Sequence, residues 1–186
     1  MDSNHDWEVV ESRTEYETGW YEGGYDEVKQ PDGSTKQYYW AELPPAVIVV
    51  ARHDDDIVFV EQYRPTVGEK HVELVAGIVE DDDGEGGDER VGYEEAGVRE
   101  LQEETGFVAE EATLLQDFRV ATGVLRHDRG IVYAEVVDEG ESSLDENEFL
   151  SVRRVPVEDA LDVARRAPAN DATLEGILLA REDGYI

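Results

Sequence analysis

The segment RELQEETGF, which begins at Arg99, carries three carboxylates within five positions and constrains this chain more than any other stretch. Read as a helix, it places Glu100, Glu103 and Glu104 at i, i+3 and i+4, so they share one face. Like charges at this spacing repel one another and destabilise a helix. Arg99 can reach Glu103 and offset part of that repulsion, and a hard divalent cation would offset the rest. The alternative is an acidic helix face exposed to solvent.

The residues around the acidic face predict where the helix is buried and where it ends. Val98 and Leu101 project roughly opposite to the carboxylates, toward a core. Gly106 is well placed to end the helix in a left-handed conformation. We therefore expect a helix over residues 92–104.

Charge and hydrophobicity together define the class of protein. The 186 residues include 47 acidic and 16 basic ones, a net charge of −31, yet 40% are hydrophobic and recur periodically. The hydrophobic content argues against disorder. An even acidic excess favours adaptation to high salt, where screening relieves self-repulsion. Nucleic acid is excluded as a primary partner because the chain has no basic stripe.

Other classes of site are excluded by what the sequence lacks. The chain has no cysteine, which rules out disulfides and thiolate metal sites. No apolar run approaches the ~20 residues of a membrane span, and no signal peptide is visible. From the sequence we expect a cytoplasmic protein without a membrane partner.

Hydrophobic patterning predicts an α+β chain with two parts. Residues 1–43 form a β-rich piece with a strong turn at 30–34, and residues 44–186 form the main domain. The piece is too short to be stable alone, so it should pack on the main body or on a second subunit. We expect a mixed sheet between helices. Strands are expected at 7–10, 20–28, 35–40, 46–50, 57–63, 71–75, 112–120, 130–137 and 149–155, with further helices at 157–167 and 171–181.

The acidic segment resembles the second half of the Nudix hydrolase signature, Gly-x5-Glu-x7-Arg-Glu-U-x-Glu-Glu-x-Gly-U, in which U is apolar. The first half departs from that pattern, since strict register puts its Glu at Val91. Gly77 is the natural anchor, and residues 81–90 are interpreted as an acidic insertion. Glu85 and Glu89 are both candidates for the first Glu.

Neighbouring segments are similar to the ADP-ribose pyrophosphatase branch of this family. They are residues 60–65, 67–68, 73–77 and 146–150, together with the N-terminal β piece. The resemblance implies an α/β/α Nudix fold with an N-terminal antiparallel β appendage. It also implies metal-dependent hydrolysis of the pyrophosphate bond of ADP-ribose, giving AMP and ribose 5-phosphate.

Alternatives to ADP-ribose remain open. The branch usually has a Ser-Pro-Gly-like segment where this chain has Ala121-Thr122-Gly123, so a related nucleoside diphosphate sugar is one alternative. Others are GDP-mannose, a damaged nucleotide, or a Nudix-like domain that binds a nucleotide without hydrolysing it.

The resemblance also implies roles for individual residues in the chemistry. Glu100 and Glu104 would bind two or more Mg²⁺ or Mn²⁺ ions, with the carbonyl of Ala76 as a backbone ligand. Glu103 would ligate or orient a further metal, and Arg99 belongs to the same catalytic set. Glu148 matches the carboxylate that activates water, with Glu146 as the alternative.

Substrate contacts follow in the same way. Arg64 would contact the phosphates, its alternative being a surface salt bridge, and Gly77 would lie beside the substrate. In this branch the β piece crosses to the partner of a homodimer and stacks an aromatic ring on adenine. Trp20 matches that position, with Tyr38 or Trp40 as further candidates; the alternative is that these rings cover the core or the dimer interface.

Overall fold

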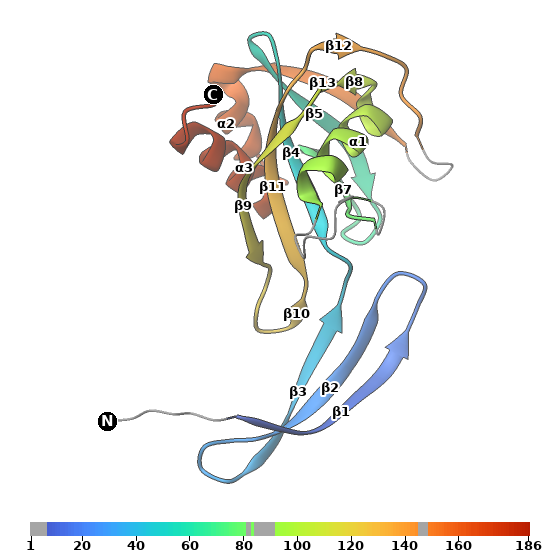
Figure 1. Cartoon of the computed structure of the whole chain (residues 1–186), viewed down its shortest axis with the longest axis vertical. Coiled ribbons are helices and arrows are strands. Elements are labelled where there is room, and N and C mark those ends of the chain that lie inside the picture. The colour runs from blue at the N-terminus through green and yellow to red at the C-terminus, as the bar shows by residue number, and fades with distance from the viewer. Residues whose placement is uncertain (1–6, 81–82, 84–91, 145–148) are drawn as a thin grey trace. The chain divides into compact units, whose positions relative to one another are not determined.

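The computed structural model describes residues 7–80, 83, 92–144 and 149–186, and the chain divides into two compact units (Figure 1). The first unit comprises Met1–Pro44 and Arg119–Asp128, and the second comprises Pro45–Phe118 and Arg129–Ile186. The N-terminal piece thus shares its unit with a segment from the middle of the chain.

The first unit is a four-stranded sheet in the order β1-β2-β3-β10. Its strands are β1 (Glu8–Glu17), β2 (Glu22–Lys29), β3 (Thr35–Glu42) and β10 (Leu125–Arg126). The turn expected at 30–34 joins β2 to β3, where Gly33 has a φ of 84° and the Asp32 carboxylate accepts from the N–H of Ser34 at 2.9 Å. Strand β10 pairs with β3 in parallel. Strand β1 continues well beyond the short strand that the sequence predicts.

The second unit contains a mixed sheet in the order β13-β5-β4-β11-β9, with β6 paired to β5 and β7 paired to β4. Strand β11 is parallel to β4, whereas β5 and β7 are antiparallel to it. A smaller sheet pairs β8 with β12. The bounds are β4 (Ala46–His53), β5 (Asp56–Arg64), β6 (Glu69–Glu73), β7 (Val75–Ile78), β8 (Phe107–Val108), β9 (Ala112–Arg119), β11 (Asp128–Glu135), β12 (Asp138–Glu139) and β13 (Leu150–Pro156).

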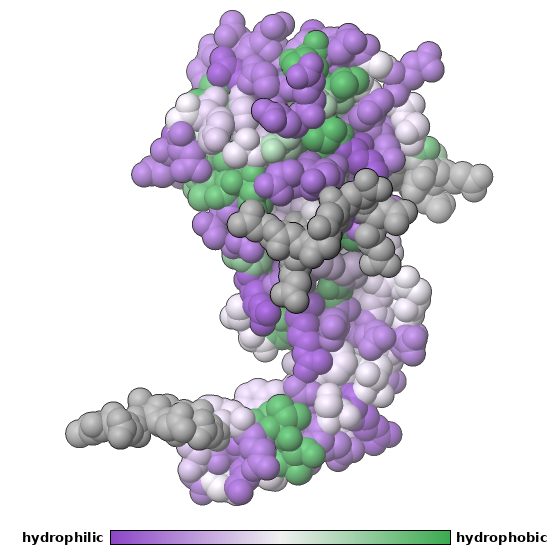
Figure 2. Space-filling model, in the orientation of Figure 1, coloured by the Kyte–Doolittle hydropathy of each residue, from purple (hydrophilic) through white to green (hydrophobic). Residues whose placement is uncertain are grey.

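Helices cover the two faces of the large sheet. They are α1 (Tyr93–Thr105), α2 (Val157–Ala164) and α3 (Asp171–Glu182). Alternate residues of β4 enter different cores: Val47 and Val49 join the core that contains α1, whereas Ile48 and Val50 join the core that contains α2 and α3. On the face of the molecule shown in Figure 2, most of the surface residues are hydrophilic. The expected fold class, a mixed sheet between helices, is confirmed.

The ends of the helices follow local sequence signals. Helix α1 ends at Gly106, whose φ of 78° is left-handed and whose N–H donates to the carbonyl of Gln102 at 2.8 Å. Helix α2 ends at Ala164, three residues earlier than expected, and Pro168 follows its C-cap Arg165 by three residues, a spacing common after helix ends. Asn170 caps α3 by accepting from the N–H of Thr173.

Within the described ranges, no helix is both long and apolar enough to cross a bilayer.

Candidate active site

The three carboxylates at positions 100, 103 and 104 of helix α1 differ in how far they are buried. Leu101 is fully buried and Val98 packs partly against the same core, as the helical spacing predicts. Glu104 is only 5% exposed, and the side chain of Glu100 is 12% exposed. Glu103 is the most accessible of the three, at 42%. An acidic face simply exposed to solvent does not describe Glu100 and Glu104, so their burial needs compensating partners.

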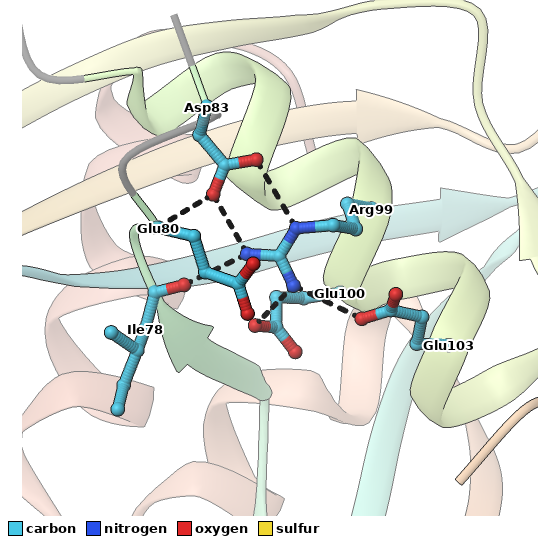
Figure 3. A network of polar contacts seen from close by, with 6 residues as sticks. All are labelled: Ile78, Glu80, Asp83, Arg99, Glu100 and Glu103. Atoms are coloured by element: carbon cyan, nitrogen blue, oxygen red, sulfur yellow. Dashed lines mark hydrogen bonds and ion pairs between the residues drawn. The ribbon is translucent and has the colours of Figure 1, made fainter. Parts of the chain in front are cut away.

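Arg99 is the centre of a polar network at the start of this face (Figure 3). Its Nη1 donates to Glu100 Oε1 at 2.9 Å and to Glu103 Oε2 at 3.0 Å. Its Nη2 donates to the carbonyl of Ile78 at 2.9 Å and to Asp83 Oδ2 at 2.7 Å, and its Nε donates to Asp83 Oδ1 at 3.1 Å. The pairing with Glu103 is the i,i+4 contact expected from the spacing. The carboxylates around Arg99 raise the pKa of its guanidinium.

Asp83 is a member of this network that the sequence interpretation missed. Its side chain is 9% exposed and binds Arg99 through both carboxylate oxygens. Burial alone raises the pKa of Asp83, but hydrogen bonds from Arg99 and from the N–H of Glu80 lower it overall. The spacing contained the signal: five residues separate Gly77 from Asp83, as in the Gly-x5-Glu half of the signature.

Gly77 on β7 makes room for the carboxylate of Glu100. A Cβ atom at position 77 would lie 1.9 Å from Glu100 Cδ, so only glycine permits this approach. Gly77 directly follows Ala76, whose carbonyl was expected to be a metal ligand, and both residues pair with β4. Strand β7 and helix α1 therefore bring together the segments that hold Glu100 and Ala76.

These residues can be tested as ligands for a divalent cation. Among the described residues, no group of three or more acidic or histidine side chains is already arranged to hold a metal ion. Nη1 of Arg99 bonds to both Glu100 and Glu103. The donor types nevertheless fit, because carboxylate and carbonyl oxygens are the ligands that Mg²⁺ and Mn²⁺ prefer. Nη1 engages one oxygen of each carboxylate, Oε1 of Glu100 and Oε2 of Glu103, so these contacts do not by themselves exclude metal binding.

An acidic groove of about 690 Å³ runs beside α1. Its charged lining comprises one cation and five carboxylates: Arg99, Glu94, Glu95, Glu103, Glu110 and Glu111. A bare phosphate would be repelled here, since like charges in a partly enclosed groove interact more strongly than in open water. Entry of an anionic substrate along this groove requires a cation.

A second cavity, of about 330 Å³, contains both Arg64 and Ala76 in its lining. Arg64 Nε donates to Glu73 Oε1 at 2.7 Å, and Asn170 Nδ2 donates to Glu73 Oε2 at 2.7 Å. Glu73 is only 6% exposed. Arg64 is therefore held by a buried carboxylate, unlike an arginine in an ordinary surface pair. Of the predicted metal ligands, only Ala76 lines this cavity together with Arg64, whereas Glu103 lines the groove beside α1.

Aromatic candidates in the first unit differ in how free their rings are. Trp20 is 65% exposed. Tyr38 makes an edge contact with the ring of Trp7, with centroids 5.7 Å apart. The guanidinium of Arg126 lies 4.0 Å from the centroid of the Trp40 ring and covers one of its faces. Of the three candidates, Trp20 has the most accessible ring.

Four acidic residues named from the sequence lie outside the described residues: Glu85, Glu89, Glu146 and Glu148. Their assignment as the first Glu of the signature or as the catalytic base stays a prediction.

Comparisons with known proteins place this geometry in context. The NUDIX domain model matches residues 42–175. A methanol dehydrogenase activator from Bacillus methanolicus is 31% identical over 150 residues, and an ADP-ribose pyrophosphatase from Bacillus subtilis (strain 168) is 32% identical over 150 residues. Each alignment covers 79% of this chain and 77% of the relative. A crystal structure of an ADP compounds hydrolase superposes with a TM-score of 0.85 and 22% identity, covering 100% of both chains.

Proposed function

The chain belongs to the Nudix family of pyrophosphohydrolases, as its sequence predicts, and we propose that it hydrolyses the pyrophosphate bond of ADP-ribose or a related nucleoside diphosphate sugar. The products from ADP-ribose are AMP and ribose 5-phosphate. The similarity to an ADP-ribose pyrophosphatase supports this substrate class.

The observation that carries the proposal is the close packing of the Glu100 carboxylate against Gly77. A buried carboxylate packed on a glycine of β7, beside Glu103 and the backbone of Ala76, offers oxygen donors at one edge of the sheet. We assign the binding of divalent cations to Glu100, Glu104 and the Ala76 carbonyl, with Glu103 as a ligand or an orienting group. Two or more Mg²⁺ or Mn²⁺ ions would neutralise the phosphates, polarise the P–O bond and lower the pKa of a bound water.

The protein's own groups position the substrate and take the proton. Arg64 binds the phosphates with the nitrogens that Glu73 leaves available, since Glu73 engages Nε. Arg99 bridges Glu100 and Glu103, because its Nη1 donates to both carboxylates. A carboxylate outside the described residues, Glu148 or its neighbour Glu146, accepts the proton of the attacking water.

Adenine recognition is assigned to Trp20 in a homodimer. A β unit with so many exposed aromatic rings is unusual on a monomer, and packing across a C₂ interface would cover them. In this arrangement the first unit of one protomer contributes to the site of the other. Sedimentation should give about twice the chain mass of 20.9 kDa. A fully active monomer would contradict the shared site.

A second candidate function is regulation of another enzyme. One relative is named methanol dehydrogenase activator, at an identity close to that of the pyrophosphatase. Under this alternative, the chain binds a nucleotide ligand without hydrolysing it. ADP-ribose that binds at equilibrium and stays intact in the presence of Mg²⁺ would favour regulation.

The deciding experiment is turnover of ADP-ribose by the full chain in molar KCl with Mg²⁺, with products separated by chromatography. We expect AMP and ribose 5-phosphate, and no turnover after the cation is removed with a chelator. GDP-mannose and oxidised nucleotides assayed in parallel test the other substrates. Faster turnover of any of these would replace ADP-ribose, and no turnover of the whole panel would overturn the enzymatic assignment.

A further inference from the structure

Asp83 makes contacts that an ordinary loop carboxylate does not make. Its side chain is 9% exposed and grips Arg99 at two nitrogens. We propose that Asp83 is a positioning residue that sets the carboxylates of Glu100 and Glu103 through Arg99, and so takes the place of the first Glu of the family signature. The catalytic part of this inference rests on the proposed function.

The planarity of the guanidinium carries the effect from Asp83 to the helix. Asp83 holds Nε and Nη2, and the carbonyl of Ile78 holds Nη2 from another side. Because the five N–H donors of arginine form a rigid fork, fixing two nitrogens also fixes the third. Nη1 is the nitrogen left over, and it reaches both Glu100 and Glu103 (Figure 3). Without the charge of Asp83, the guanidinium of Arg99 is held less firmly, and Nη1 no longer has a fixed orientation toward Glu100 and Glu103.

Asp83 is itself held by the backbone that follows β7. Its Oδ2 accepts from the N–H of Glu80 at 2.8 Å, and its own N–H donates to the carbonyl of Glu80 at 3.0 Å. One residue earlier, the N–H of Val79 donates to the carbonyl of Pro45 at 3.0 Å, which ties the turn to the start of β4. A connected series of contacts therefore leads from the sheet to Asp83, from Asp83 to Arg99, and from Arg99 to Glu100 and Glu103.

Sequence spacing supports the same assignment independently. Gly77 and Asp83 have five residues between them, the number in Gly-x5-Glu. Asp83 and Arg99 have fifteen residues between them instead of seven, an excess of eight that equals residues 84–91. The insertion therefore follows Asp83, instead of starting at residue 81, and the acidic position of the signature is occupied before it begins.

Substitutions at Asp83 test the proposal with a readout that does not depend on turnover. Asp83→Asn keeps the size and removes the charge, and Asp83→Glu keeps the charge. In calorimetric titration of Mn²⁺ into the substrate-free protein, Asp83→Asn should weaken binding by about 10–100-fold, the effect typical of losing a group that orients ligands. The kcat for ADP-ribose should fall by a similar factor, KM should change less, and Asp83→Glu should recover most of both.

A matched control is Asp128→Asn, which removes a carboxylate paired with Arg119 at 3.3 Å in the first unit. It should leave Mn²⁺ affinity and kcat unchanged. An Asp83→Asn protein that melts earlier but binds Mn²⁺ and turns over normally would show a structural role only, and would overturn the proposal. So would a wild type that does not bind Mn²⁺.

The double variant Glu85→Gln, Glu89→Gln tests the sequence-based alternatives to Asp83. If this double variant loses Mn²⁺ affinity while Asp83→Asn keeps it, Glu85 or Glu89 acts as the first Glu of the signature, and the proposal fails. Because Mn²⁺ affinity is measured without substrate, it decides the role of Asp83 even if ADP-ribose proves to be the wrong substrate.

Discussion

The two units of this chain bury their apolar residues to very different extents. In the second unit, helices enclose the sheet, and Val49, Val50 and Phe59 are fully buried. In the first unit, β1 is exposed along all ten residues, and among the hydrophobic residues that the structure describes there, only Tyr25 and Val28 are buried. The unit that carries the acidic helix has its own core, whereas the other is a sheet with little interior of its own.

This difference suits the two units to different tasks, chemistry in the second unit and recognition in the first. Groups for chemistry need positions fixed to fractions of an ångström, which a packed core can supply. An exposed aromatic sheet suits recognition of a base or of a second subunit. Changes in the second unit should therefore act on turnover, and changes in the first on substrate affinity and assembly.

The largest expected effect is in the second unit, at Glu103 and Glu104. Replacing either by Gln keeps the shape but removes an anionic oxygen ligand. Turnover of ADP-ribose should fall at least ~100-fold, the scale expected when a charge-stabilising group is lost. Steady-state kinetics measure it, and the thermal midpoint should hardly move. Near-normal activity in either variant would remove that residue from the catalytic set.

A smaller effect is expected in the first unit from Trp20→Ala. Loss of base stacking costs about 1–3 kcal/mol if it resembles stacking in single-stranded nucleic acids. KM for ADP-ribose should rise more than kcat falls, because the base is remote from the reacting phosphorus. Tyr39→Ala is the control, since Tyr39 is 59% exposed on the same sheet. An unchanged KM would move adenine recognition to Tyr38 or Trp40.

The thermal unfolding of the two units can be followed separately at different salt concentrations. All three tryptophans, at positions 7, 20 and 40, lie in the first unit, whereas α1, α2 and α3 lie in the second. Tryptophan fluorescence and helical circular dichroism therefore report on different units. Both thermal midpoints should rise from dilute buffer to molar KCl, by at least about 2–4 °C, the shift for about 1 kcal/mol in a chain of this size.

The fluorescence transition should come first on heating at low salt, because the first unit buries less. Coincident transitions at every salt concentration would mean that the units unfold together. Midpoints that do not respond to salt would mean that the charge of −31 has a cause other than adaptation to salt.

The smallest effect concerns acid stability of the first unit. Burial alone raises the pKa of Asp26, but hydrogen bonds from Ser12, Arg126 and Trp40 lower it overall. A lowered pKa in the folded state stabilises the sheet above the ordinary carboxyl pKa, and that stability is lost as the pH falls through the folded pKa. Asp26→Asn should cost at most about 1 kcal/mol at neutral pH. It should also flatten the fluorescence-detected loss of stability below about pH 4.

Much of the fold was predictable because its signals are local. The alternation and apolar runs predicted the main strands, the Pro-Asp-Gly turn predicted the hairpin of β2 and β3, and Gly106 predicted the end of α1. Strand β10 carried no such signal: it has two residues, and its partner β3 is distant in sequence. The membership of residues 119–128 in the first unit followed from that pairing and could not be read from periodicity.

At the candidate site, spacing along one helix was predictable and contacts between distant segments were not. The pair of Arg99 and Glu103 is an i,i+4 contact, so the sequence contains it. Asp83 was missed because the insertion was placed at residues 81–90, so the first acidic position after Gly77 was sought at Glu85 or Glu89. The contact between Glu73 and Asn170 joins residues 97 apart, and no local pattern predicts it.

The parallel pairing of β3 with β10 has a consequence for synthesis on the ribosome. Strand β3 ends at Glu42 and β10 ends at Arg126, so 84 further residues must be added before the partner strand is complete. At about 5–20 residues per second, translation leaves that edge of β3 open for about 4–17 s. An open strand edge is a template for pairing with other chains. Nascent chains emerging close together on one message are therefore exposed to mispairing at β3 until residue 126 has been added.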